Sequence, residues 1–369
     1  MKILITGGGH FSPAMAVIES LPKGISVLMV GRKYSFEGDN ALSIEYIVCQ
    51  ERGIPFIALS TGRLQRKFTK YTISSLLKIP FGFFKAQKIM RDFKPDVVLS
   101  FGGYISLPVV LAAYAFRTPI VVHEQTLEAG MANKIASYFT KKVCISWESS
   151  RKFFPKKKVV LTGNPIRRFK IKDLRLKIKD DEKLPIIYVT GGSSGSHAIN
   201  LLVEGCIEGL LENFIVFHQT GDAKEFNDFE RLNTFKKTLK SSLQKRYILE
   251  KFVPMQNVGE VINRADLIIS RSGINTITEL LFFGKPAILI PITFSQRNEQ
   301  LKNATFLQEH GLAKVLEQET TTSETLYQEI LEMLKQKNEY MKSAKEAKKL
   351  VIPDARERIL AVLQQVVKK

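Results

Sequence analysis

The sequence predicts an α/β protein made of two doubly wound, Rossmann-like halves. Along most of the chain, short apolar runs that suit buried parallel strands alternate with segments of helical periodicity. A glycine-rich turn follows the first strand of each half, at residues 7–9 and at residues 191–195. A charged stretch of low hydrophobicity, which ends at Lys183, separates the halves. Alternating strands and helices on both sides of one linker are typical of two α/β domains.

The length and composition indicate the size, cellular compartment and binding partners of the protein. The chain has 369 residues, enough for two domains, and its 44% hydrophobic and 25% charged residues are typical of globular proteins. The formal net charge of +19 predicts an anionic partner, which fits nucleic acid, an acidic membrane surface or phosphorylated substrates. The 3 cysteines are scattered, which indicates neither a disulfide framework nor a zinc site. Because the N-terminus lacks a signal peptide and no apolar run reaches roughly 18–20 residues, we expect a cytoplasmic protein.

The first glycine-rich turn follows the strand predicted at Ile3–Thr6. The turn reads Gly7-Gly8-Gly9-His10, and Ser12 and Pro13 form a good N-cap and N1 pair for a helix that ends at Leu21. Such a turn is a common phosphate cradle, but it lacks the G-x-G-x-x-G spacing and the ribose-binding acid of a dinucleotide site. Taken alone, the histidine of this turn fits a general base or an ordinary loop residue, and the second is the commoner case.

Two later strands of the first half also end in glycine or polar residues. The run Pro95–Ser100 is followed by Gly102-Gly103-Tyr104, and the run Thr118–Val122 by His123-Glu124-Gln125. Because the carboxyl ends of parallel strands meet at one edge of a sheet, these residues and the first turn predict a single crevice. This convergence favours functional roles for both histidines together.

The segment from Arg63 to Lys94 is basic and rich in aromatic residues. It carries 9 Lys or Arg against the single acid Asp92, and the stretch Leu76–Phe84 is too apolar for an ordinary exposed face. Such a basic amphipathic segment predicts contact with a membrane surface. The alternative is that the aromatic residues belong to the core and the lysines form a solvated face. The coincidence of charge bias and apolar excess favours the membrane.

In the second half, the apolar run Ala265–Ile269 leads into a helix that begins near Ser272. This is a strand, a tight turn and a helix N-terminus, whose free N–H groups and dipole attract phosphate. Ser272, Thr276 and Glu279 fall at i, i+4 and i+7, so one helix face carries two hydroxyls and a carboxylate. A diphosphate at the helix N-terminus, with a ribose hydroxyl on Glu279, would use that face. An ordinary turn capped by Ser272 explains the stretch equally well.

These elements predict the domain boundaries and the absence of a bound metal. We expect an N-terminal domain at residues 1–165, a C-terminal domain at 166–352 and a last helix at 353–369 that returns to the first domain. Two doubly wound halves with glycine turns facing a shared cleft describe a GT-B-like architecture. No D-x-D motif occurs, so we expect neither a metal nor a cofactor. The charge of a diphosphate would then be met by helix N-termini, backbone N–H groups and a basic residue.

Several motifs spread over nearly the whole chain are specific together, although each is weak alone. They are the first glycine turn with His10, Pro95-Asp96-Val97-Val98, Gly102-Gly103-Tyr104, His123-Glu124-Gln125, Asn133-Lys134, Gly163-Asn164-Pro165-Ile166-Arg167, Gly191-Gly192-Ser193, Arg271-Ser272-Gly273, Thr278-Glu279, Gln300, Asn303-Ala304 and Ile352-Pro353-Asp354-Ala355. With them the sequence resembles the MurG family. These enzymes transfer N-acetylglucosamine (GlcNAc) from UDP-GlcNAc to lipid I and so make lipid II of peptidoglycan.

The resemblance implies two sets of site residues and a base. The donor-binding residues would be Arg167, Ser193, Val253, Ser272, Gly273, Ile274, Asn275, Thr276, Ile277, Glu279, Glu299 and Gln300. Among them the backbone of Val253 would bind uracil, Glu279 the ribose and Gln300 the sugar. The acceptor-binding residues would be Gly7, Gly8, Gly9, His10, Gly102, Gly103, Tyr104, His123, Glu124, Thr126 and Asn133. The catalytic residues would be His10, as the base for the hydroxyl on C4 of N-acetylmuramic acid (MurNAc), and Glu279.

The sequence departs from the family pattern in four places. The first glycine turn is shorter than the usual Gly-Gly-Gly-Thr-Gly-Gly-His. Thr126 stands where Asn is usual, Ser194 where Gln is usual, and Glu299 where some members have Gln. We expect these changes to affect the acceptor geometry and the donor-sugar contacts more than the UDP site.

The resulting hypothesis is an inverting, metal-independent glycosyltransferase on the cytoplasmic face of the membrane. Its expected partners are UDP-GlcNAc, lipid I and an anionic membrane surface, and no nucleic acid. One alternative is a related transferase for another membrane lipid such as diacylglycerol. A nucleic-acid-binding protein would explain the charge but leave the glycine turns unexplained. A UDP-sugar epimerase on the same two-domain plan would need no lipid surface.

Overall fold

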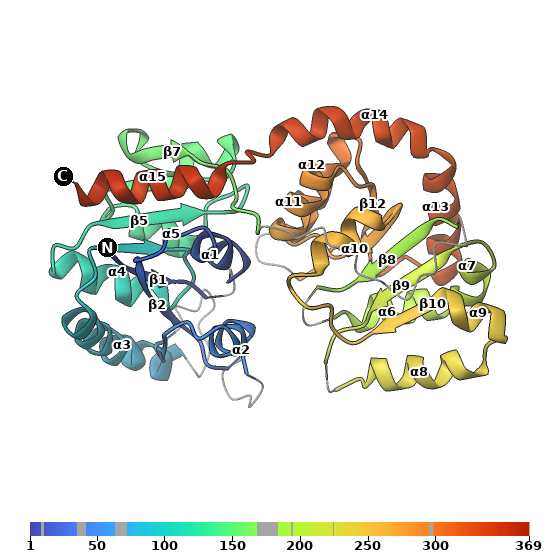
Figure 1. Ribbon diagram of the computed structural model, residues 1–369, viewed down its shortest axis with the longest axis horizontal. Helices are drawn as coiled ribbons and strands as arrows, with labels where there is room; N and C mark the ends of the chain where they lie inside the picture. The colour runs from blue at the N-terminus through green and yellow to red at the C-terminus, as the bar shows by residue number, and fades with distance from the viewer. Residues whose placement is uncertain are drawn as a thin grey trace. The chain divides into compact units, whose positions relative to one another are not determined.

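The computed structural model divides the chain into two compact α/β units. It describes residues 1–8, 11–34, 42–62, 72–167, 184–192, 195–223, 225–294 and 298–368, and within 72–79 only the backbone. Unit 1 comprises Met1–Arg167 and Ile352–Lys369, and unit 2 comprises Arg168–Val351 (Figure 1). The first division thus falls at Arg167, near the boundary that we expected at residue 165. The predicted pair of doubly wound halves, the plan of a GT-B fold, is confirmed.

Unit 1 is built on a parallel sheet. In the part of the chain that the structure describes, its strands are β1 (Lys2–Thr6), β2 (Ser26–Gly31), β3 (Phe56–Ala58), β4 (Val97–Ser100), β5 (Ile120–Glu124), β6 (Lys142–Ile145) and β7 (Val159–Leu161). Their order is β3-β2-β1-β4-β5-β6-β7, and all neighbours pair in parallel. The strand order reverses between β1 and β4, and ligands of open α/β sheets bind at such a switch point.

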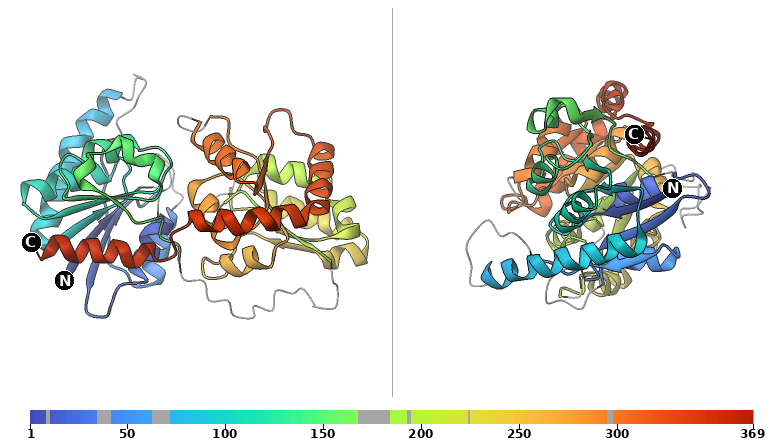
Figure 2. Two further views of the ribbon diagram at one scale, coloured as in Figure 1. Left: turned by 90° about the horizontal axis from the view of Figure 1, so that it is seen from above. Right: turned by 90° about the vertical axis from the view of Figure 1, so that its left-hand side faces the viewer.

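Helices cover both faces of the unit 1 sheet (Figure 2). They are α1 (Phe11–Ile18), α2 (Ile44–Glu51), α3 (Thr72–Phe93), α4 (Ser106–Ala115), α5 (Met131–Ala136) and α15 (Ala355–Val367), with 3₁₀ turns η1 (Glu148–Phe153) and η2 (Lys156–Lys158). Helix α4 packs against α3 and α5, whereas α15 packs against α1 and the strands β4, β5 and β6. Because helices cover the sheet on both sides, Ile3, Leu4 and Ile5 of β1 are all fully buried and do not alternate.

Helix α1 differs from its prediction at both ends. It spans Phe11–Ile18, so Pro13 lies within the first turn, where its missing N–H costs no hydrogen bond. The helix ends before Leu21, because Pro22 disfavours a helical conformation at the residue that precedes it. The hydroxyl of Ser20 donates to the Val17 carbonyl at 2.7 Å and helps to close the last turn.

Unit 2 repeats the plan of unit 1. Within the described residues its strands are β8 (Ile186–Thr190), β9 (Ile215–Gln219), β10 (Tyr247–Glu250), β11 (Leu267–Ser270), β12 (Ala287–Leu289) and β13 (Ala313–Val315). All neighbours pair in parallel in the order β10-β9-β8-β11-β12-β13. The switch point lies between β8 and β11, so the second glycine turn and the turn after β11 both follow strands at the switch point.

The helices of unit 2 connect these strands. They are α6 (His197–Glu204), α7 (Ile207–Asn213), α8 (Asp228–Thr238), α9 (Ser241–Arg246), α10 (Val258–Arg264), α11 (Ile274–Phe283), α12 (Glu299–Glu309), α13 (Ser323–Lys335), α14 (Lys337–Ala347) and the 3₁₀ turn η4 (Lys348–Leu350). Helix α11 has Gly273 as its N-cap, in an extended conformation, and Gly284 as a left-handed C-cap. Ser272 therefore does not cap this helix, contrary to the simpler of the two hypotheses for this stretch.

Candidate functional site

In unit 1, the turns after β1 and β4 pack against each other. Thr6 and Ser100 are register partners, so the two turns begin at the same level of the sheet. The backbone N–H of Gly8 donates to the Gly102 carbonyl at 3.2 Å. Gly103 has φ +84°, and a Cβ added to it would lie 2.7 Å from the Gly8 carbonyl oxygen. Glycine is thus required here both by the backbone conformation and by the close approach of the turns.

Asn133, on helix α5, lies against the second of these turns. Its Nδ2 donates to the His123 carbonyl at 3.1 Å and to Glu124 Oε2 at 3.0 Å. A Cβ added to Gly102 would lie 2.6 Å from Asn133 Oδ1. That oxygen is buried and has no hydrogen-bond partner among the described residues. The side chain therefore supports the turn after β4 from inside the domain.

Glu124 organises the loop that leads from β5 to α5. It is 1% exposed, and it accepts hydrogen bonds from Thr126 N at 3.0 Å, Thr126 Oγ1 at 2.6 Å and Gly130 N at 2.9 Å, in addition to that from Asn133. Burial raises the pKa of its carboxyl group, and these hydrogen bonds oppose the shift. Gly130 is the N-cap of α5, so the carboxylate also fixes the start of that helix.

His123 is an interior side chain with 0% exposure. Its Nε2 lies 3.0 Å from the Gly163 carbonyl, and its ring centroid lies 5.2 Å from that of Phe101. Burial lowers the pKa of the imidazole to about 4, so the ring is neutral at pH 7. We had expected the side chains of His123, Glu124 and Thr126 to contact the acceptor. The structure instead places them behind the turns, bonded to the protein itself.

Within the two turns, Gly7 and Gly102 are buried, whereas Gly8 and Gly103 are partly exposed. Gly7 and Gly8 are described, whereas Gly9 and the candidate base His10 lie outside the described residues. Tyr104, at the far end of the second turn, is half-buried. Sequence reasoning missed Trp147, whose Nε1 donates to the carbonyl of Gln125 at 2.9 Å and holds the β5 loop from the side of β6.

In unit 2, β8 and β9 hold the second glycine turn. The Gly192 N–H donates to Thr190 Oγ1 at 3.0 Å, and the Gly192 carbonyl accepts from Gln219 Nε2 at 3.0 Å. Gly195, at the other end of the turn, has φ +76°, and a Cβ added to it would lie 2.1 Å from the Thr220 carbonyl oxygen. The turn is therefore fixed at both ends, while Ser193 lies outside the described residues.

The turn before α11 presents different side chains from those expected. Ser272 is 0% exposed, because its hydroxyl donates to the Gln300 carbonyl at 2.7 Å. Ser272 precedes α11, so helical spacing does not apply to it. The prediction that Ser272 shares a helix face with Thr276 and Glu279 is therefore wrong. Ile274 and Ile277 are buried, and the partly exposed face carries Asn275, Thr276 and Glu279. Burial raises the pKa of the Tyr188 hydroxyl on β8, and the charge of Glu279 adds to this shift.

Two residues behind this turn connect it to the elements that follow. Asn303 Nδ2 donates to the Ser272 carbonyl at 3.0 Å. Arg271 donates to the Ile290 carbonyl at 2.8 Å and to Gln318 Oε1 at 2.6 Å, and burial lowers the pKa of its guanidinium. The sequence motifs contain both residues but assign neither of them a role. Their positions, directly after the end of β11 and in the second turn of α12, are the signals that mark them.

The remaining predicted donor residues lie at element ends. Gln300, in the first turn of α12, accepts from Ile292 N at 3.1 Å through Oε1, and Glu299 begins that helix. Val253 follows β10 with a buried side chain, and Arg167 is the half-buried last residue of the first segment of unit 1.

Comparisons with known proteins define the class. The N-terminal domain of glycosyltransferase family 28 matches residues 3–145, and the C-terminal domain of that family matches residues 186–359. The fold and its glycine turns therefore belong to a family 28 glycosyltransferase.

The particular family follows from full-length relatives. The UDP-N-acetylglucosamine–N-acetylmuramyl-(pentapeptide) pyrophosphoryl-undecaprenol N-acetylglucosamine transferase of Clostridium botulinum (strain Loch Maree / Type A3) is 33% identical over 94% of this chain and 95% of its own length. The crystal structure of Acinetobacter baumannii MurG is 25% identical and aligns with a TM-score of 0.70 over 99% of this chain and 100% of its own. The chain belongs to the MurG family.

A further structural neighbour shares only the fold. The UDP-GlcNAc 2-epimerase of Neisseria meningitidis, solved bound to UDP-GlcNAc, aligns with a TM-score of 0.67 over 99% of this chain and 100% of its own, at 16% identity. It explains why an epimerase was a reasonable alternative, since the two enzymes share the two-domain plan. The full-length relatives favour the transferase.

Proposed function

We propose that this protein transfers GlcNAc from UDP-GlcNAc to the C4 hydroxyl of MurNAc in lipid I, the undecaprenyl-diphospho-MurNAc-pentapeptide. The product is lipid II, a precursor of peptidoglycan. The observation that carries this conclusion is the 33% identity, over 94% of the chain, to relatives that are named for the reaction. The protein is thus a hexosyltransferase of cell-wall synthesis.

Unit 2 binds the donor in this proposal. The N–H groups of the β8–α6 turn and of the α11 N-terminus meet the diphosphate, because the N-terminal end of a helix carries a positive dipole that attracts anions. Residues Gly273–Ile277 supply that N-terminus, and Arg167 and Ser193 assist at the diphosphate or sugar. Glu279 binds the ribose. The backbone of Val253 binds uracil, and Glu299 and Gln300 bind the sugar.

Unit 1 binds the diphosphate of lipid I in the pair of turns formed by Gly7–Gly9 and Gly102–Tyr104. Close packing of these turns brings two sets of backbone groups to one edge of the sheet at its switch point. The interior group His123, Glu124, Thr126 and Asn133 holds the turns in place without contacting the acceptor. Their burial and their hydrogen bonds within unit 1 support this indirect role.

The reaction is a single displacement with inversion. His10 removes the proton from the C4 hydroxyl of MurNAc, and the oxygen attacks C1 of GlcNAc from the face opposite UDP. The C1–O bond to UDP breaks, and the negative charge on the departing diphosphate falls to the N–H groups of the second glycine turn and of α11. Such preorganised donors each contribute about 10²–10³-fold to the rate. We propose that no metal takes part, since no D-x-D motif is present.

Helix α3 brings unit 1 to the membrane surface. Phe81 and Phe84 are 75% and 65% exposed, and Lys88 and Arg91 lie on the same exposed helix face, three to four residues apart along it. Phe83, by contrast, packs against the core. In the part of the chain that the structure describes, no helix combines the length and apolarity needed to cross a membrane. Apolar insertion and charge attraction by α3 are the two terms that surface binding needs. We propose the cytoplasmic face of the membrane as the surface that α3 binds.

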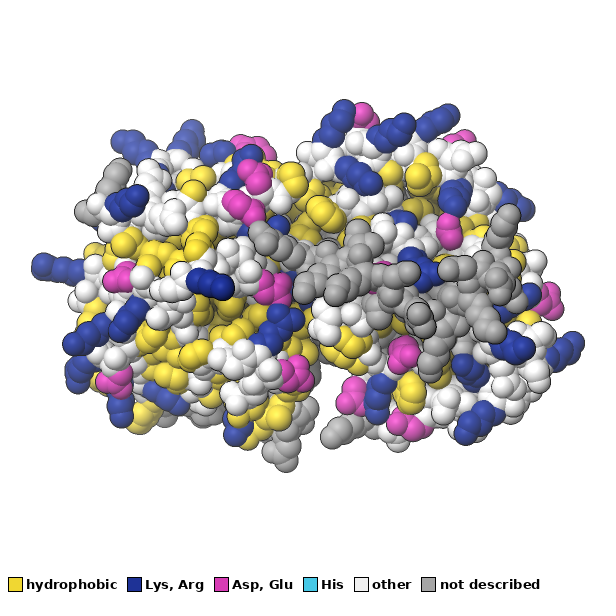
Figure 3. Space-filling view, in the orientation of Figure 1, with side chains coloured by type: hydrophobic (Ala, Val, Ile, Leu, Met, Phe, Trp, Pro, Cys, Tyr) yellow, Lys and Arg dark blue, Asp and Glu magenta, His cyan; other side chains and the backbone are white. Residues whose placement is uncertain are grey.

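Basic residues are also spread around the edge of unit 1 on the face shown in Figure 3. This distribution supports attraction to an anionic leaflet over a wide surface. The rest of the basic aromatic segment, residues 63–71 and the side chains of 72–79, lies outside the described part of the chain.

The deciding experiment supplies labelled UDP-GlcNAc with lipid I or with diacylglycerol, each in detergent micelles. Label is expected in lipid II and not in a glycosyl diacylglycerol. Labelled glycosyl diacylglycerol without lipid II would replace this proposal by the related lipid transferase.

The role of His10 gives the first prediction. His10→Ala should lower kcat by at least about 10²-fold, because a general base contributes typically 10²–10⁴-fold, and leave the dissociation constant of UDP nearly unchanged. The same kinetics on His123→Gln serve as the comparison. That variant should mainly lose stability, since His123 is interior. A near-normal kcat for His10→Ala would remove it from catalysis.

A further inference from the structure

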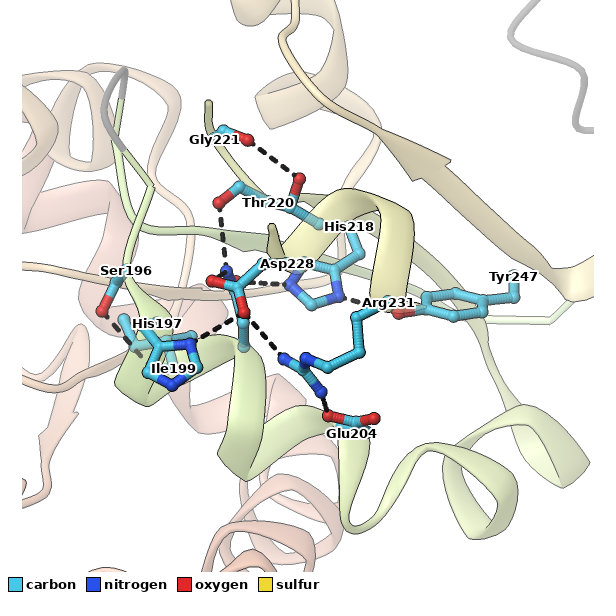
Figure 4. Close-up of polar contacts among 11 residues, drawn as sticks. Ser196, His197, Ile199, Glu204, His218, Thr220, Gly221, Asp228, Arg231 and Tyr247 are labelled. Atoms are coloured by element: carbon cyan, nitrogen blue, oxygen red, sulfur yellow. Dashed lines mark hydrogen bonds and ion pairs between the residues drawn. The ribbon is translucent and has the colours of Figure 1, made fainter. Parts of the chain in front are cut away.

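Asp228, the first residue of α8, accepts hydrogen bonds from two helices and has no contact role in the donor site described above. Its side chain is 5% exposed. Its carboxylate receives His197 Nδ1 at 2.8 Å, Asn200 Nδ2 at 2.8 Å and Arg231 Nη2 at 2.7 Å (Figure 4). A carboxylate only accepts, so the Nδ1 of His197 must carry a proton.

Asn200 extends this contact into the interior of unit 2. It is 0% exposed, and its Nδ2 also donates to the Thr220 carbonyl at 3.1 Å. Both acceptors of Nδ2 are oxygens, so the amide has one orientation and its Oδ1 faces His218 Nε2 at 3.0 Å. Burial lowers the pKa of His218 to about 3, so the ring is neutral, with its proton on Nε2. Its Nδ1 then accepts from the Tyr247 hydroxyl at 3.0 Å.

The result is one directional chain of hydrogen bonds from Tyr247 on β10, through His218 and Asn200, to Asp228. Each bonded atom in this chain acts either as a donor or as an acceptor. No hydrogen bond can reverse its direction without leaving a buried group unpaired. An unpaired buried group costs more than a hydrogen bond contributes, so the chain has one arrangement.

This network converges on the second glycine turn. His197 and Asn200 lie in the first two turns of α6, which the Ser196 side chain caps. Thr220, bonded to Asn200, is the residue whose carbonyl packs against Gly195. Asp228 therefore ties the start of α6, the end of β9 and the end of the turn to one side chain from α8.

We propose that Asp228 and Asn200 are positioning residues for the donor diphosphate. They act through the Gly191–Gly195 turn and the α6 N-terminus and do not touch the nucleotide. The inference rests on the proposed function, in which that turn binds the diphosphate of UDP-GlcNAc. Backbone N–H groups stabilise an anion only when they converge on it, and the network fixes the Gly195 end of the turn and the α6 N-terminus before the donor arrives.

The matched pair for the test is Asp228→Asn against Glu204→Gln. In Asp228→Asn, the amide nitrogen replaces one carboxylate oxygen and faces an N–H donor of His197 or Asn200. The hydrogen bond to that donor is then lost. Glu204, the last residue of α6, forms an ion pair with Arg231. Its substitution loosens the same two helices at the end away from the turn and leaves the contacts of Asp228 with His197 and Asn200 intact.

Titration calorimetry with UDP separates positioning from a purely structural role. A partly unfolded sample lowers the number of binding sites per chain, whereas a misplaced turn raises the dissociation constant. Asp228→Asn is expected to raise the dissociation constant of UDP about 3- to 10-fold, the factor of one net hydrogen bond, and Glu204→Gln less than about 2-fold. In kinetics, the KM for UDP-GlcNAc should rise while the KM for lipid I stays constant.

Unchanged affinity of Asp228→Asn with full stoichiometry would overturn the proposal, as would an equal loss in both variants. If Asp228→Asn does not fold, His197→Ala decides, because that side chain is 31% exposed and its removal leaves the Asn200 contacts in place. A UDP affinity of His197→Ala equal to that of the wild type then overturns it. Failure of the wild type to bind UDP would instead reject the proposed donor site.

Discussion

At the scale of single residues, glycines that need a positive φ or a close approach are the positions that the sequence predicts best. Gly102 and Gly195 have φ of +80° and +76°, and each stands where a Cβ would meet a neighbouring atom closer than 3 Å. Such glycines are visible in the sequence, because they belong to glycine-rich turns that follow apolar runs. What they pack against is set by residues that are distant in the chain.

The partly exposed carboxylate of Glu279 gives the second residue-scale prediction. Glu279→Ala would leave the ribose hydroxyls of UDP without their partner, which costs roughly 1–3 kcal/mol of binding free energy. Calorimetry with UDP should therefore show a dissociation constant that is at least several-fold larger than that of the wild type. Glu208→Ala, an exposed acid on α7, is the control and should bind as the wild type does. Equal affinities for the two variants would exclude Glu279 from the donor site.

The roles that differed from expectation are those of buried polar residues. Ser272 follows β11 closely, as predicted, whereas His123 lies within β5, which continues past the predicted end at Val122 to Glu124, and both side chains are bonded inside the protein. Their partners, the carbonyls of Gln300 and Gly163, lie 28 and 40 residues away in sequence. Local pattern places a side chain at a strand end, whereas only tertiary packing decides whether it faces solvent or the interior.

At the scale of elements, the amphipathic pattern of α3 predicted the segment's unusual exposure. The helix continues through Pro80, and Gly82 lies against Thr61 so closely that a Cβ would be 2.4 Å from its Oγ1. That contact fixes which face turns outward. The sequence could identify an apolar and basic helix, but the separation of Phe83 from its neighbours Phe81 and Phe84 depended on where α3 meets α4 and the core.

The membrane prediction belongs to this helix. Binding of the wild type to anionic vesicles should weaken with added salt but persist, because charge attraction is screened within about 8 Å whereas apolar insertion is not. The double variant Phe81→Ser with Phe84→Ser should lose the salt-resistant part. Co-sedimentation at low and high salt measures both parts.

Phe294→Ser is the matched control, since Phe294 of unit 2 is 94% exposed and lies outside α3. It should sediment as the wild type does. Equal salt-resistant binding by the double variant, with its fold intact, would place the membrane contact on another surface.

At the scale of the whole molecule, the two-domain plan followed from the alternation of elements and the charged linker. The strand order did not, because parallel pairing between distant strands leaves no local signal. That order puts the switch points at β1–β4 and β8–β11, and so explains why turns far apart in sequence follow neighbouring strands in each sheet.

The last helix gives a prediction at this scale. Leu363 of α15 is 0% exposed and packs in unit 1, so Leu363→Ala should lower the free energy of unfolding by about 2–5 kcal/mol. Denaturant titration monitored by circular dichroism measures the loss. Gln365→Ala, an exposed position on the same helix, should change it by less than about 0.5 kcal/mol. Similar values for both variants would mean that α15 adds little to unit 1.

Because α15 belongs to unit 1, the first unit to be synthesised is the last unit whose sequence is complete. On a ribosome, residues 1–167 emerge first, but their sheet lacks the helix that covers it beside α1 until the chain has been extended past residue 355. Unit 2 is encoded without interruption between these segments and has its full sequence earlier. A nascent chain therefore carries an unfinished first domain, with an apolar strip uncovered, for as long as the second domain takes to be made. Chaperone demand during translation should accordingly fall on the first domain.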